Sequence, residues 1–149
     1  IDTMLVPTAD RKVPAAWGWH PYLRVPGTPR SRWTVSLPRR EHLALDERGI
    51  PTGASTRETA EEGALGRRRF DDLYQLGRDR RLAFTGEDGA SVALQGNPHY
   101  PYAQVWVPPG KPFAALEPMA APTNALVTGN THLVAPGDAF TATFTLTVT

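Results

Sequence analysis

The chain has 149 residues, and its 16 Lys and Arg against 15 Asp and Glu leave a net charge of +1. This balance gives no electrostatic reason to expect nucleic acid or an anionic membrane surface as a partner. No stretch approaches the roughly 18 apolar residues of a membrane helix. The chain has no cysteine, so a disulfide framework and a thiolate metal site are excluded. We expect a cytoplasmic protein that binds neither nucleic acid nor membrane.

The length suits a single domain, residues 1–149, with a sizeable hydrophobic core. Fifteen prolines and thirteen glycines are spread along the chain, which is typical of many short strands separated by turns. The first residue is Ile1 rather than Met, and no signal-peptide pattern is visible. We therefore expect the chain to be a piece of a longer product.

Short runs with strand character follow one another in order. Residues 32–37 alternate, which places Trp33, Val35 and Leu37 on one face. The closing run, residues 140–149, alternates apolar residues with threonines, as expected of a half-buried antiparallel strand. The other expected strands cover residues 3–6, 42–45, 70–76, 81–85, 90–95, 102–107 and 113–117.

Three segments between these runs are predicted to be irregular. Residues 86–89 contain Asp88-Gly89, a strong hairpin-turn signal. Residues 46–69 are interrupted by Gly and Pro and carry no apolar stripe, so we predict a loop. Residues 122–126 are predicted to form a turn or one helical turn. With no other helix expected, the predicted fold class is all-β, an antiparallel β-sandwich.

Two residues could perform general acid–base chemistry. His20 lies between bulky aromatic residues and Pro21, and a proline there suggests a strand end or edge, where sites commonly form. Glu117 is the one charged residue in the apolar run 112–121. A partly desolvated glutamate would have a raised pKa suited to a general base. The alternatives are a structural buried histidine and a glutamate that points into solvent.

Asp71 and Asp72 are adjacent, so on a strand they face opposite ways and at most one can point into a given site. They could equally be counter-charges to the arginines at 67–69. Tyr22 and Gln104 belong to clusters of aromatic and amide groups, which suit a sugar-binding cleft but are also explained by core packing. His42 and His132 have no companion at metal-ligand spacing, so a surface or structural role is expected.

Three segments, in this order, resemble the aldose 1-epimerase (galactose mutarotase-like) family. Residues 18–23 resemble its Gly-x-His-Pro-Tyr segment, which ends in Phe or Leu and whose histidine is the catalytic acid. Residues 70–74 are similar to the segment whose aspartate binds sugar hydroxyls, and aligning the aromatic at Tyr74 selects Asp71, with Asp72 as the neighbouring alternative. Residues 116–126 resemble the segment that holds the catalytic base, which would be Glu117.

The resemblance implies a supersandwich fold and interconversion of the α and β anomers of a free hexose, without metal or organic cofactor. His20 would protonate the ring oxygen while Glu117 takes the proton of the C1 hydroxyl. Asp71, with Tyr22 and Gln104, would bind the sugar. The expected partner is a small-molecule aldohexose or a sugar phosphate, for which the arginines at 30, 32 and 67–69 offer positive charge.

The match covers only the C-terminal portion of the longer family members. The portion without a counterpart here supplies a further Arg or His in the family, and no residue of this chain matches that role. We therefore expect association with the missing N-terminal portion or with a second copy. Two other functions are weighed: a non-catalytic carbohydrate-binding module, and a structural β-domain within a larger carbohydrate-processing protein.

Overall fold

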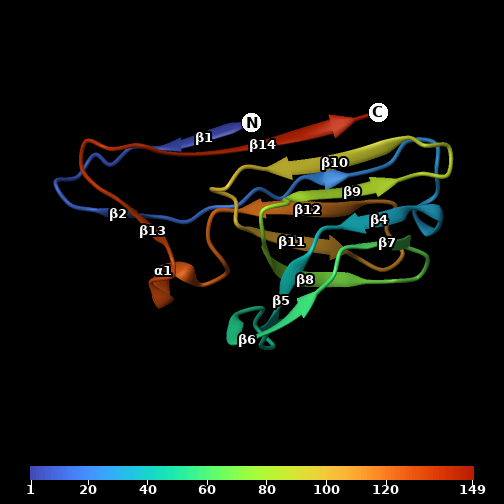
Figure 1. The fold of residues 1–149 in the computed structure, drawn as a ribbon, viewed down its shortest axis with the longest axis horizontal. Coiled ribbons are helices and arrows are strands. Elements are labelled where there is room, and N and C mark those ends of the chain that lie inside the picture. Colours follow the sequence, from blue (N-terminus) through green and yellow to red (C-terminus); the bar gives the residue numbers. More distant parts are fainter.

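The computed structural model describes residues 1–149, and nearly all of its regular structure is β-strand (Figure 1). The strands are β1 (Asp2–Leu5), β2 (Val13–Ala15), β3 (Tyr22–Leu23), β4 (Thr34–Leu37), β5 (Arg40–Leu45), β6 (Pro51–Glu58), β7 (Glu61–Ala64), β8 (Phe70–Leu76), β9 (Arg81–Thr85), β10 (Ser91–Gly96), β11 (Tyr102–Val107), β12 (Ala114–Met119), β13 (His132–Val134) and β14 (Phe140–Val148). The helical segments are a 3-10 turn (Arg30–Arg32) and α1 (Ala125–Thr128). The predicted all-β class is confirmed.

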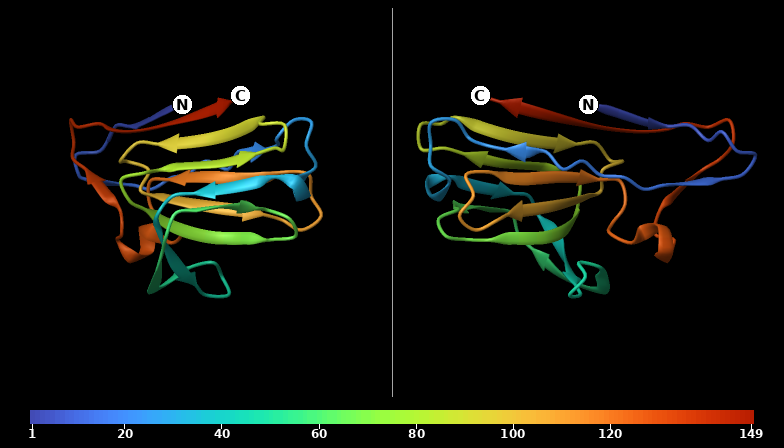
Figure 2. Two further views of the ribbon diagram at one scale, coloured as in Figure 1. Left: turned by 45° about the vertical axis from the view of Figure 1, so that its right-hand side comes forward. Right: turned by 180° about the vertical axis from the view of Figure 1, so that it is seen from behind.

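Two six-stranded antiparallel sheets form the body of the molecule. The first sheet has the order β1-β14-β10-β9-β4-β7, and the second has the order β3-β12-β11-β8-β5-β6. A ribbon of β2 and β13 extends from one end, and both chain termini lie along the edge formed by β1 and β14 (Figures 1 and 2). The predicted hairpin of β9 and β10 is present and turns at residues 86–89.

One continuous hydrophobic core joins the two sheets. The predicted face of Trp33, which precedes β4, and of Val35 and Leu37 on β4 is at most 3% exposed. On β11, Val105 is completely buried, whereas Gln104 is partly exposed. The second sheet therefore has an inner face, which packs on the core, and an outer face. The outer face carries the candidate site.

The predicted loop at residues 46–69 is wrong, because β6 and β7 lie within it. Both are edge strands, β6 in the second sheet and β7 in the first. The interior of β6 is exposed on both sides, so its sequence shows no alternation of apolar and polar residues. Gly53, with φ of +92°, adds a glycine that usually signals a break. An edge strand without a buried face leaves little periodic signal.

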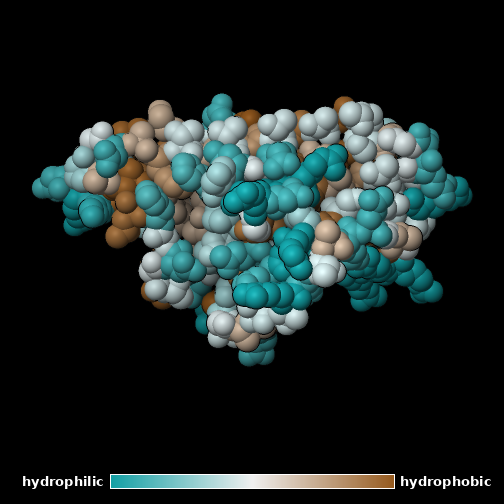
Figure 3. All heavy atoms as spheres, in the orientation of Figure 1, coloured by the Kyte–Doolittle hydropathy of each residue, from teal (hydrophilic) through white to brown (hydrophobic).

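Figure 3 shows hydrophilic side chains over most of one face of the molecule, with apolar residues gathered at the end where β2 and β13 lie. Leu133 in β13 is 55% exposed there. This apolar end does not contain the candidate site described below. None of the helical segments has the length and apolar character needed to cross a membrane.

Candidate active site

Three neighbouring strands of the second sheet bring polar residues together on its outer face. Gln104 of β11 lies opposite Glu117 of β12, and Trp106 of β11 lies opposite Asp71 of β8. Directly opposed residues of an antiparallel pair share a face of the sheet. The register therefore places residues from distant parts of the sequence side by side, on strands whose other face is buried in the core.

His20 reaches the same face from the segment that precedes β3. The backbone N–H of Trp19 donates to the carbonyl of Pro118 at 3.1 Å, and Gly18 forms a β-bridge with Met119. A Cβ at Gly18 would lie 3.0 Å from the Met119 Cγ, so glycine permits this close approach. The result is a contact of 3.0 Å between His20 Nε2 and Glu117 Oε1.

Glu117 is the unusual carboxylate of this face. Its side chain is 14% exposed, whereas that of His20 is 48% exposed. Burial, followed by the negative charge of Asp71, raises the pKa of Glu117 to about 7. Because its pKa is near neutral, this carboxyl group can both accept and return a proton under physiological conditions. The solvent-facing orientation considered for Glu117 is excluded by its burial.

Asp71 and Asp72 face opposite sides of the sheet, as strand alternation predicts. Gln104 Nε2 donates to Asp71 Oδ1 at 2.8 Å on the outer face. Asp72 lies on the other side, where it accepts a hydrogen bond from the Tyr74 hydroxyl at 3.3 Å and lies 3.4 Å from His42 Nε2. Asp71 is therefore the aspartate that shares a face with Glu117.

Aromatic rings border the His20–Glu117 pair. Tyr22 stacks on the His20 ring with 4.9 Å between centroids, and Trp106 meets that ring edge-on at 5.5 Å. Phe113 packs against both Tyr22 and Trp106. Tyr22 is 63% exposed, so the group forms an accessible apolar wall beside the polar side chains. This combination of groups suits a sugar, which has C–H faces as well as hydroxyls.

A cavity of about 500 Å³ opens between these residues. Its lining includes His20, Asp71, Gln104, Trp106 and Glu117. Tyr22 is not part of this lining and lies behind the His20 ring. Four of the five residues predicted for the site therefore share one cavity.

The turn between β5 and β6 also lines this cavity, through residues 45–49. No pattern in the sequence indicates this contribution. The only local signal was turn chemistry, with Asp46 before Gly49. A turn signal does not show which part of the protein the turn lies against, because that position depends on the pairing of β5 with β8.

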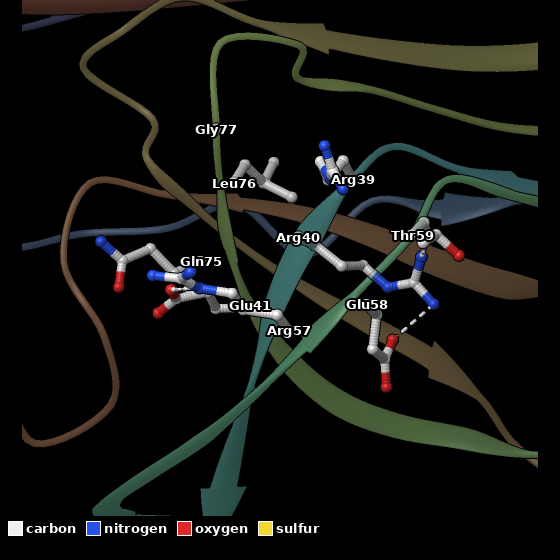
Figure 4. A pocket seen from close by; sticks show the side chains of 9 residues that line it. All are labelled: Arg39, Arg40, Glu41, Arg57, Glu58, Thr59, Gln75, Leu76 and Gly77. Carbon is white, nitrogen blue, oxygen red and sulfur yellow. Dashed lines mark hydrogen bonds and ion pairs between the residues drawn. The ribbon is translucent and has the colours of Figure 1, made fainter.

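A second cavity, of about 530 Å³, lies beside β5, β6 and β8 and contains none of the predicted site residues (Figure 4). Arg40 reaches across it toward Glu58, with 2.6 Å between Nη2 and Oε2. Arg40 pairs with Glu58 and Arg57 pairs with Glu41 in this cavity, whereas Arg39 has no ion-pair partner. No group of three or more His, Cys, Asp or Glu side chains is arranged to hold a metal ion.

The fold matches solved structures of the galactose mutarotase-like class. A galactose mutarotase-like protein from Clostridium acetobutylicum aligns with a TM-score of 0.86 and 20% identity, over 99% of this chain and 51% of that one. A candidate aldose 1-epimerase from Escherichia coli K12 aligns with a TM-score of 0.77 and 17% identity, over 99% of this chain and 55% of that one. A protein from Synechocystis sp. PCC 6803 aligns with a TM-score of 0.77 and 22% identity, over 99% of this chain and 49% of that one.

The sequence matches the family model of aldose 1-epimerase over residues 3–147, and the chain belongs to this family. No curated protein matches it significantly. The chain spans about half the length of the solved structures that it resembles.

Proposed function

We propose that the protein is an aldose 1-epimerase that interconverts the α and β anomers of a free hexose. The observation that carries this proposal is the 3.0 Å contact of His20 with Glu117, whose pKa is raised to about 7. The presence of His20 and Glu117 in one cavity of about 500 Å³ supports an acid and a base that act on the same sugar. A cytoplasmic location is part of the same proposal.

In the proposed reaction, protonated His20 gives its proton to the ring oxygen while Glu117 takes the proton of the C1 hydroxyl. The bond between C1 and the ring oxygen breaks, and C1 becomes an aldehyde. Rotation about the C1–C2 bond presents the other face of the aldehyde to the C5 hydroxyl. Ring closure then returns both protons, so the catalyst is restored and the other anomer is released.

The remaining residues support binding rather than proton transfer. Asp71, oriented by Gln104 at 2.8 Å, would accept hydrogen bonds from sugar hydroxyls. Trp106 would contact the C–H face of the sugar, and Tyr22 would fix the plane of the His20 ring. We propose that the longer family members' additional portion, or a second copy, completes this open face.

Polarimetry on freshly dissolved α-glucose and α-galactose tests the proposal. The native protein should accelerate the change in optical rotation, and Glu117→Gln should abolish the acceleration while retaining the shape of the side chain. Absence of acceleration by the native protein, with sugar affinity retained, would instead support a non-catalytic carbohydrate-binding module. The aromatic wall of Tyr22, Trp106 and Phe113, in which Tyr22 is exposed, is the observation that favours this second candidate.

A further inference from the structure

The turn between β5 and β6 brings an arginine to the cavity that contains His20 and Glu117. Arg48 lines this cavity together with its neighbours in the turn. The arginines at positions 30, 32 and 67–69, which offered positive charge for a sugar phosphate, do not line it. Arg48 is therefore the arginine that this chain contributes to the catalytic cavity.

The turn is held by its own hydrogen bonds. The Asp46 carboxylate accepts from the backbone N–H groups of Arg48 and Ile50, both at 2.9 Å. The backbone of Asp46 also bonds with Ile50 and with Gly49, and Gly49 adopts a φ of +72°. None of these bonds uses the Arg48 side chain. The turn thus presents the guanidinium from a fixed backbone, which lowers the entropic cost of using it for binding.

The guanidinium of Arg48 has no partner within the chain. It forms no ion pair within 4.0 Å and no side-chain hydrogen bond, whereas Arg40, Arg57 and Arg68 each pair with a glutamate. An arginine side chain carries five N–H donors. Those of Arg48 are free for a molecule that enters the cavity.

The other charges of the cavity indicate what that molecule would be. Asp46, Glu47, Asp71 and Glu117 line the same cavity. Even without Glu117, which keeps its proton part of the time, Asp46, Glu47 and Asp71 outnumber Arg48 and a protonated His20, so a phosphate dianion placed among them would be repelled. A neutral hydroxyl accepts a hydrogen bond from a guanidinium and donates one to a carboxylate, so it suits this mixture of groups.

We propose that Arg48 is a substrate-binding residue that donates hydrogen bonds to hydroxyls of an uncharged aldose. The inference rests on the proposed function for the identity of the ligand, but not on turnover. Arg48 takes part in orienting the sugar between Asp71 and the His20–Glu117 pair. No motif in the sequence marks this role.

Affinity for glucose, measured by titration calorimetry or by ligand-observed NMR, tests the proposal in the Glu117→Gln background, where turnover does not interfere. Adding Arg48→Ala should weaken binding about tenfold, the usual loss for a hydrogen bond from a charged donor, and Arg48→Lys should restore part of it. Arg24→Ala is the matched control, because Arg24 is exposed and lies outside the cavity. It should leave the affinity unchanged.

Glucose 6-phosphate provides the second arm and should bind more weakly than glucose. Unchanged glucose affinity in Arg48→Ala overturns the role of Arg48. Tighter binding of the phosphate ester, lost in Arg48→Ala, overturns the uncharged substrate. Arg48-dependent binding by a native protein that fails to accelerate mutarotation would reject the proposed function and leave this proposal standing. Absence of any sugar binding rejects both.

Discussion

Two histidines of this chain contact carboxylates on opposite faces of the same sheet. On the outer face, His20 lies 3.0 Å from Glu117, and no arginine or lysine pairs with that carboxylate. On the inner side, His42 lies between Glu58 and Asp72, at 3.0 and 3.4 Å. The second cluster also contains Arg40, which is 6% exposed and pairs with Glu58.

The difference lies in how the buried negative charge is balanced. Burial raises the pKa of Glu61, but hydrogen bonds and charges from Arg68 and Arg40 outweigh this effect and lower it. Burial also raises the pKa of Glu117, and the nearby charge of Asp71 raises it further, to about 7. The inner cluster therefore keeps fixed charges that hold strands together, whereas the outer pair keeps a proton that can move.

The largest expected effect is on kcat, and it distinguishes His20 from His42. We expect His20→Ala to reduce kcat about 10²–10⁴-fold, the usual contribution of a positioned acid or base. His42→Gln should leave kcat per folded molecule unchanged, because His42 lies on the other side of the sheet. Mutarotation rates from polarimetry, with circular dichroism to check folding, would measure both. A comparable loss in His42→Gln would contradict the separate roles of the two histidines.

The second prediction concerns stability. Arg40→Met should lower the free energy of unfolding by about 3 kcal/mol, because it removes a buried cation that two partly buried carboxylates share. Those carboxylates belong to Glu58 and Glu61, about 30% exposed. Arg57→Ala is the control, since its side chain is 91% exposed, and should change stability by no more than about 0.5 kcal/mol. Urea unfolding would measure both; equal effects would refute the structural role of Arg40.

The third prediction concerns how the stability of the fold depends on pH. Glu117 binds its proton more tightly in the folded chain, with a pKa of about 7, than at its ordinary value of 4.5. The folded state therefore holds more protons between these values, and its stability falls as pH rises from 4.5 to 7. Glu117→Gln should remove this contribution and stabilise the protein at pH 8 by up to about 3 kcal/mol. A less stable variant at pH 8 would contradict the burial argument.

The smallest expected effect tests the coupling between Asp71 and Glu117. The native pH profile of kcat/KM should rise with pH through about 7, as Glu117 ionises. Asp71→Asn removes a negative charge that raises this pKa, so the rise should move to lower pH. KM should increase about tenfold at the same time, because a charged hydrogen-bond acceptor is lost. An unmoved profile would mean that Asp71 acts in binding alone.

Residues with a buried face were predictable from the sequence. The alternation in β4 and in the first half of β14 is confirmed, since Trp33, Val35, Phe140 and Phe144 are buried. The all-β class and the opposite orientations of Asp71 and Asp72 follow from the same periodicity. The edge strands β6 and β7 were missed because they lack a continuous buried face.

The candidate site was predictable only where a motif or resemblance marks a residue. His20 and Glu117 lie in segments similar to family motifs, and the structure brings them within 3.0 Å. Arg48 could not be found in this way, because its place in the cavity depends on the pairing of β5 with β8. Local sequence describes the turn, whereas its position follows from contacts between distant strands.

The opposite orientation of Asp71 and Asp72 also limits where the coding sequence can accept an inserted codon. Inserting one codon ahead of position 71 within β8 would rotate every following side chain to the other face. Asp71 would then take the inner position that Asp72 now occupies, and the buried side chain of Tyr74 would move to the outer face. An insertion in the turn between β9 and β10, far from the cavity, would meet no such restriction. Insertions should therefore be tolerated better the farther they lie from β8, β11 and β12.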